Sequence, residues 1–111
     1  MAQPRLLLHL TEEQREIQRV ARDFARQEIA PYAVQWDRER HFERSLVGKM
    51  GELGFLGMLI PPEYDGLGLD TGTYLIALEE IATVDAASSI AMGVHNSLPT
   101  QMILKWGTSE Q

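Results

Sequence analysis

The apolar residues of this chain recur at the three- and four-residue intervals of an α-helix, and prolines and glycines interrupt the pattern at a few points. This spacing gives each helix one apolar stripe to bury against its neighbours. No two segments alternate apolar and polar residues as paired strands do. The chain is therefore expected to be all-α, an irregular bundle of about five helices with one long Pro/Gly-rich loop between the third and fourth. Its 111 residues suit one hydrophobic core, so residues 1–111 are assigned to a single helical domain.

The first helix has the clearest start. Residues 1–10 are expected to form a leader strand or loop. Thr11 and Gln14 then make a T-x-x-Q capping box, in which each side chain bonds the backbone N–H of the other residue. Pro31 is expected to end this helix or to start a new one.

Two shorter helices are predicted next. One runs from Tyr32 to Arg40 and is expected to turn Val34 and Trp36 inward. The other is expected to be capped by Ser45 and to stop at Gly54.

A long loop follows. Residues 55–60 are apolar and precede two prolines, so this stretch is expected to be extended and buried rather than helical. Residues 63–72 are rich in glycine and complete the loop.

A fourth helix is predicted over residues 72–84, with Glu79 and Glu80 lying off its apolar stripe. That stripe comprises Tyr74, Leu75, Leu78, Ile81 and Ala82. A fifth helix, capped by Asp85 or Ser88, is predicted to run from residue 86 towards residue 106 and to end at Gly107. Because Pro99 lies inside it, a kink or break is expected near residues 95–98.

Charge and composition exclude several classes of function. The net charge of −6 leaves no excess of basic residues for contacting nucleic acid or an anionic membrane. The chain has no cysteine, and His9, His41 and His95 are not at metal-ligand spacing, so no metal site is expected. The apolar run at residues 6–8 is too short for a signal peptide or a membrane span. We therefore expect a soluble protein of the cytoplasm, or of the mitochondrial matrix if a leader has been removed.

No catalytic or cofactor-binding residue is assigned from motifs. Gly66 and Gly68 follow no strand and precede no Gly-Lys-Ser/Thr, so turn geometry explains them better than phosphate binding. Glu79 and Glu80 diverge by about 100° on a helix and cannot act as facing carboxylates, although one of them could pair with an arginine of the first two helices. His95 has a serine nearby but no acidic partner, so a surface histidine is the better interpretation.

The helix after Asp85 carries two kinds of residue. Residues 86–93 are mostly small, which favours either tight helix packing or the close approach of a ligand. Ile90, Val94 and Leu98 recur every fourth position and would form an apolar lining on one face. Tight packing and a pocket wall both remain open from periodicity alone.

Short motifs follow one another along nearly the whole chain. They are Leu10-Thr11-Glu12-Glu13-Gln14, Phe24-Ala25, Ile29-Ala30-Pro31-Tyr32-Ala33 with Trp36-Asp37, Leu53-Gly54-Phe55-Leu56-Gly57, Ile60-Pro61-Pro62-Glu63-Tyr64-Asp65-Gly66-Leu67-Gly68, Leu78-Glu79-Glu80-Ile81-Ala82 and His95-Asn96-Ser97-Leu98. Each is weak alone. Their order and spacing resemble the N-terminal helical domain of the acyl-CoA dehydrogenase family.

This resemblance implies a function for the whole protein. Family members use FAD to remove two hydrogens from the α and β carbons of an acyl-CoA thioester, and they pass electrons to an electron-transferring flavoprotein. It implies that Ile90, Val94 and Leu98 line the acyl-chain pocket. It also implies that the catalytic base and most of the flavin site lie in a middle β-domain and a C-terminal helical domain, and that the full-length protein is a homo-oligomer. The alternatives are a flavin oxidase of the same fold and a stand-alone helical interaction module, which would expose no large apolar face.

Overall fold

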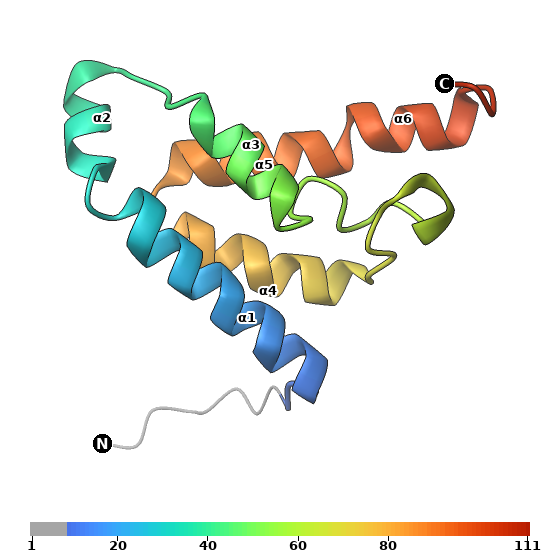
Figure 1. Cartoon of the computed structure of the whole chain (residues 1–111), viewed down its shortest axis with the longest axis horizontal. Coiled ribbons are helices and arrows are strands. Elements are labelled where there is room, and N and C mark those ends of the chain that lie inside the picture. Colours follow the sequence, from blue (N-terminus) through green and yellow to red (C-terminus); the bar gives the residue numbers. More distant parts are fainter. Residues whose placement is uncertain (1–8) are drawn as a thin grey trace.

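The computed structural model describes residues 9–111, and nearly all of the predicted leader segment lies outside that range. Within it the chain is helical and has no strand, which confirms the all-α prediction (Figure 1). Its elements are α1 (Glu12–Phe24), the π-helical turn η1 (Ala25–Ile29), α2 (Ala33–Glu39), α3 (Ser45–Glu52), the 3₁₀ turn η2 (Pro62–Tyr64), α4 (Thr71–Ala82), α5 (Ala86–Ser97) and α6 (Pro99–Trp106).

The capping box at the start of α1 forms as predicted. Thr11 Oγ1 accepts a bond from Gln14 N at 3.1 Å, and Gln14 Oε1 accepts one from Thr11 N at 3.0 Å. The Gln14 amide also donates to Thr73 Oγ1 at 3.2 Å, which joins this helix start to α4. Asp70 caps α4 by accepting a bond from Thr73 N at 2.7 Å, so α4 begins just before the predicted Gly72.

The segment joining α1 to α2 is a π-helical turn that the sequence pattern did not predict. Ala25 and Ile29 are fully buried in it. The turn widens the helix by one residue before Pro31, and the chain then restarts as α2. In α2 the prediction for Val34 is wrong, since its side chain is 65% exposed. Trp36 is partly buried as expected, packs on the core and stacks on Tyr32.

The helix α3 needs no capping side chain. Ser45 is its first residue rather than its cap, and its hydroxyl donates to Glu43 Oε1 at 3.1 Å. Leu46 and Met50 are the residues of α3 that reach the core. The helix ends one residue before its C-cap Leu53, and Gly54 follows with a φ of +83°.

Residues 55–60 are buried in part but are folded into turns, so the prediction of an extended segment is wrong. Gly57 N bonds Gly54 O at 3.2 Å, and Ile60 N bonds Gly57 O at 3.2 Å. The chain then doubles back, with Leu67 N bonding Gly57 O at 2.9 Å and Gly68 N bonding Ile60 O at 2.8 Å. These hydrogen bonds pair backbone N–H and C=O groups in a segment where the two following prolines prevent regular helix or strand hydrogen bonding.

The core lies where α4 packs between α1 and α5 (Figure 1). The buried face of α4 is shifted from the predicted stripe, because Leu75 is 51% exposed and Ala77 is buried instead. The buried apolar residues are Ala21, Phe24, Ala25, Ile29, Leu46, Met50, Phe55, Met58, Tyr74, Ala77, Ile81 and Met92. The smallest dimension of the chain is 19 Å, which is about two helix diameters, so the helices form a flat slab.

Candidate functional site

The helix that carries the predicted pocket residues is held at its start by a side-chain cap. Asp85 is in the extended conformation, and its carboxylate accepts bonds from both the backbone N–H and the hydroxyl of Ser88. Asp85 is therefore the cap, and Ser88 lies inside the first turn, buried to 1% exposure. The small residues that follow let α4 approach closely, since a Cβ at Gly93 would lie 3.3 Å from the Tyr74 hydroxyl.

The same helix ends where the sequence predicted a kink or break. Leu98 leaves the helical region with φ −110° and ψ −82°, and Pro99 starts α6. Pro99 has no N–H to give to the carbonyl of His95. The Thr100 hydroxyl replaces it, donating to His95 O at 2.6 Å and to Asn96 O at 3.0 Å. The predicted end at Gly107 is also confirmed.

The three predicted pocket residues share one exposed face. Ile90 is 63% exposed, Val94 45% and Leu98 55%. The apolar exposure continues along α6. We define the α5–α6 apolar face as Ile90, Val94, Leu98, Met102, Ile103 and Trp106, each of which is at least 45% exposed.

The opposite face of α5 belongs to the core. Ser88, Met92 and Asn96 also recur every fourth position, and all are buried to 1% exposure or less. They lie about 200° around the helix from Ile90 and Val94. Both interpretations of the small-residue segment therefore have a physical basis, because tight packing occupies one side of α5 while an apolar face remains open on the other.

The polar residues near the end of α5 do not form a nucleophilic set. His95 is exposed on the surface, as predicted. Ser97 donates its hydroxyl to Gly93 O at 2.7 Å, within its own helix. Asn96 is fully buried and was missed by the sequence analysis. Its burial could have been inferred from its position four residues after Met92, which places both residues on the same face of the helix.

The acidic pair on α4 has a structural role. Glu80 pairs with Arg22 of α1, with Arg22 Nη2 at 2.8 Å from one carboxylate oxygen and Nε at 3.1 Å from the other. The hydrogen bond and the charge of Glu80 raise the pKa of Arg22. Glu79 is exposed. Among residues 9–111 no cluster of three or more potential ligands could hold a metal ion.

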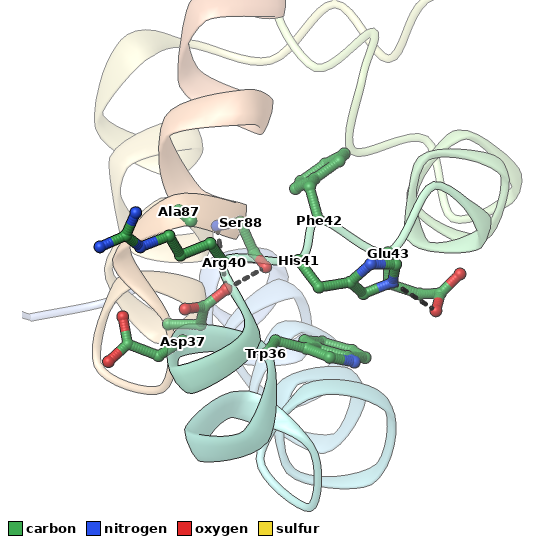
Figure 2. Close-up of a pocket in the computed structure, with 9 residues that line it drawn as sticks. Trp36, Asp37, Arg40, His41, Phe42, Glu43, Ala87 and Ser88 are labelled. Atoms are coloured by element: carbon green, nitrogen blue, oxygen red, sulfur yellow. Dashed lines mark hydrogen bonds and ion pairs between the residues drawn. The ribbon is translucent and has the colours of Figure 1, made fainter.

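A cleft of about 270 Å³ lies between the α2–α3 connection and the first turn of α5 (Figure 2). Trp36 and Phe42 supply its aromatic walls. His41 Nε2 lies 3.3 Å from Glu43 Oε2, and Figure 2 shows the two side chains next to each other. The hydrogen bond from His41, with those from Ser45, lowers the pKa of the Glu43 carboxyl. Two pairs of polar side chains in the cleft, His41 with Glu43 and Asp85 with Ser88, thus bond each other.

The comparison with known families identifies the family of this chain. The family described as "Acyl-CoA dehydrogenase, N-terminal domain" matches residues 11–111. The chain belongs to the acyl-CoA dehydrogenase family.

Relatives and solved structures of this family are similar along nearly the whole chain. Short-chain specific acyl-CoA dehydrogenase of Rattus norvegicus is 46% identical over 94% of this chain and 25% of its own length. Butyryl-CoA dehydrogenase of Megasphaera elsdenii has a TM-score of 0.83 and 29% identity, over 93% of this chain and 28% of that one. A chain of the structure described as the electron transferring flavoprotein of Acidaminococcus fermentans has a TM-score of 0.88 and 39% identity, over 93% and 27%.

The chain spans about a quarter of the length of the curated relatives that it matches. No helix within residues 9–111 is both long and apolar enough to cross a membrane.

Proposed function

We propose that this chain is the N-terminal helical domain of an FAD-dependent acyl-CoA dehydrogenase, in which Ile90, Val94 and Leu98 form one wall of the acyl-chain pocket. The observation that carries the proposal is the α5–α6 apolar face, exposed on a chain that spans a quarter of its relatives. Monomeric soluble proteins rarely leave a row of large apolar side chains uncovered. A middle β-domain and a C-terminal helical domain, as the family has, would complete the fold.

The proposed substrate is an acyl-CoA thioester with a short chain. The support is the short-chain specific relative, together with side chains at Ile90, Val94 and Leu98 that are purely aliphatic and suit a hydrocarbon tail. By covering the substrate, this wall would exclude water from the reacting carbons. A water-free site strengthens the electrostatic interactions that acidify the α carbon of a thioester.

Flavin binding is assigned mainly to the other domains. In residues 9–111 every buried polar side-chain atom has a hydrogen-bond partner within the chain, which supports this assignment. We assign the catalytic base to the other domains as well. When bound, FAD would accept the hydride from the β carbon, and the contribution of this chain would be to shape and dry one side of the cavity.

The partners and compartment of the full-length protein are proposed on the same basis. An electron-transferring flavoprotein is the proposed electron acceptor, and the similarity to a chain from the Acidaminococcus fermentans flavoprotein structure supports it. We propose a homo-oligomer, located in the cytoplasm or the mitochondrial matrix. The rat relative is named as mitochondrial.

The test of the pocket is Val94→Trp in the full-length protein. The larger side chain would shorten the pocket, so kcat/KM for octanoyl-CoA should fall about tenfold or more relative to butyryl-CoA. Flavin content, measured from the visible absorbance, should stay close to that of the unsubstituted protein, because Val94 is not assigned to the flavin site.

The matched control is Glu79→Trp, which adds the same bulk at an exposed position of α4. It should leave the ratio of the two substrates unchanged. An unchanged ratio in Val94→Trp would remove Val94 from the pocket wall. Transfer of the electrons to molecular oxygen, measured as hydrogen peroxide, in place of transfer to an electron-transferring flavoprotein would instead favour the flavin oxidase alternative.

The stand-alone interaction module is disfavoured by the surface itself. That alternative requires a domain without an exposed apolar face, whereas Trp106 is 71% exposed and Ile90 63%. The interaction module and the enzyme domain can be distinguished by expressing residues 1–111 alone. A module would be monodisperse, whereas a domain that lacks its covering layers would self-associate.

A further inference from the structure

Asn96 is a buried polar side chain that joins the end of α5 to the turn after α3. Its side chain is fully buried. Nδ2 donates to Phe55 O at 2.8 Å and to Met92 O at 2.9 Å, while Oδ1 accepts a bond from Met58 N at 3.1 Å. A backbone N–H needs an acceptor and a carbonyl needs a donor, so these partners fix the orientation of the amide.

The turn depends on this amide. Phe55 is 3% exposed and packs edge-on against Phe24 with ring centroids 6.0 Å apart, and Met58 is fully buried. Within residues 9–111 no other protein group bonds Phe55 O or Met58 N. Removing the Asn96 amide would leave both backbone groups buried without a partner, which is unfavourable enough to shift the turn or the helix.

The position of Asn96 links this contact to the α5–α6 apolar face. It lies two residues after Val94 and two before Leu98, so it points about 200° away from each of them around the helix. The amide thus attaches the buried side of α5 to the turn at the same height along the helix as the exposed side chains of Val94 and Leu98. The Thr100 hydroxyl, which bonds the Asn96 carbonyl at 3.0 Å, ties the break before α6 to the same point.

We propose that Asn96 is a positioning residue for substrate specificity. By fixing the distance and rotation of α5 relative to the Phe55–Met58 turn, it sets where Val94 and Leu98 stand and therefore which acyl-chain length the pocket accepts. This inference rests on the proposed function, in which those side chains line the acyl pocket.

The experiment compares two substitutions in the full-length flavoprotein. Asn96→Leu keeps the branched shape and the number of side-chain heavy atoms, with a somewhat larger volume, but removes every side-chain hydrogen bond. Asn96→Ser can keep a bond to the Met92 carbonyl within the helix, as Ser97 does to Gly93, but its side chain is too short to reach the turn. The control is Ile29→Ala, a fully buried site in η1 whose side chain takes no part in the Asn96 hydrogen bonds, with assays run equally far below each variant's melting temperature.

Two readouts separate the steps of the inference. Hydrogen–deuterium exchange of the peptide covering residues 55–60 reports the tether directly, because Met58 N–H is protected by Asn96. The ratio of kcat/KM for octanoyl-CoA and butyryl-CoA reports the pocket. Both Asn96 variants should exchange faster in this peptide, and their ratio should move towards the longer chain by about threefold or more. Ile29→Ala should not move the ratio.

The outcomes are distinct. Unchanged exchange in both variants, or an equal shift of the ratio in Ile29→Ala, would overturn the positioning role. Faster exchange with an unchanged ratio would also overturn it while leaving the pocket intact, provided that Val94→Trp still changes the ratio. If Val94→Trp has no effect either, the pocket assignment itself fails.

Discussion

Gly66→Ala tests whether the loop between α3 and α4 is held as the structure shows. A Cβ at Gly66 would lie 2.1 Å from the carbonyl oxygen of Ile60 and 2.4 Å from its Cβ. Non-bonded heavy atoms are stable at separations of about 3.5–4.0 Å, so the loop segments around Ile60 and Gly66 would have to move apart by roughly 1.5 Å. That movement would disrupt the bonds from Leu67 N to Gly57 O and from Gly68 N to Ile60 O.

The size of the effect follows from these contacts. Two backbone hydrogen bonds contribute about 0.5–1.5 kcal/mol each. The overpacking caused by the added Cβ destabilises the fold by about another 1–3 kcal/mol. The lower entropy of alanine in the unfolded chain offsets about 0.4–1 kcal/mol. We therefore expect Gly66→Ala to lower the free energy of unfolding by about 1–5.5 kcal/mol.

Gly48→Ala is the matched control, because it is the same substitution in an open place. Gly48 lies inside α3 with nothing within 4 Å of the added Cβ. Alanine is better than glycine in a helix interior by about 0.5–1 kcal/mol, so this variant should be stabilised. Equilibrium urea unfolding of both variants, followed by circular dichroism, measures the difference. If the two variants unfold at the same urea concentration, the close approach of Gly66 to Ile60 is wrong.

Two further predictions concern the cap of α4 and the apolar face. The bonds from Thr73 lower the pKa of Asp70 from its ordinary value of 3.8, so the stability that this carboxylate contributes is present above pH 3.8 and is lost as pH falls through the lower, folded-state pKa. Asp70→Asn keeps a capping oxygen that does not titrate. In thermal melts from pH 6 to pH 2, the melting temperature of the variant should therefore rise relative to that of the wild type below about pH 4. A difference in melting temperature that stays constant with pH would contradict this. The double substitution Leu98→Lys with Met102→Lys should make the fragment of residues 1–111 more monodisperse in light scattering, because it interrupts the exposed apolar face. In the full-length protein the same substitutions should reduce the yield of folded protein, because the new charges would be buried without a partner. Normal yield of that full-length variant would show that the face stays in solvent.

The features that the sequence predicted correctly are those set by local chemistry. The Thr11 capping box, the Asp85 cap, the break before Pro99 and the end at Gly107 each depend on groups within a few residues. Such groups act on the same helix turn in any tertiary context. The sequence also allowed one glutamate of the pair on α4 to bond an arginine of the first two helices, and Glu80 does bond Arg22.

The features that it missed depend on contacts between distant segments. Val34 has a helical position suitable for burial, but no element within residues 9–111 covers that side of α2, and the side chain stays exposed. The turns over residues 55–60 form because residues 66–69 supply backbone partners, and those partners are invisible to a local pattern. Asn96 is buried for the same reason, since its partners Phe55 and Met58 are 41 and 38 residues away.

The two faces of α5 explain why its sequence carries apolar or small residues on nearly every side. One face, through Ser88, Met92 and Asn96, is consumed by the core of this chain. The other, through Ile90 and Val94, stays largely exposed among residues 9–111, in a slab that is about two helix diameters thick. A helix that is apolar on both sides is stable in water only when a layer covers each side. The exposed face therefore does not record a weakly packed domain. Under the proposed function a further layer covers it, with room for a hydrocarbon chain between the two.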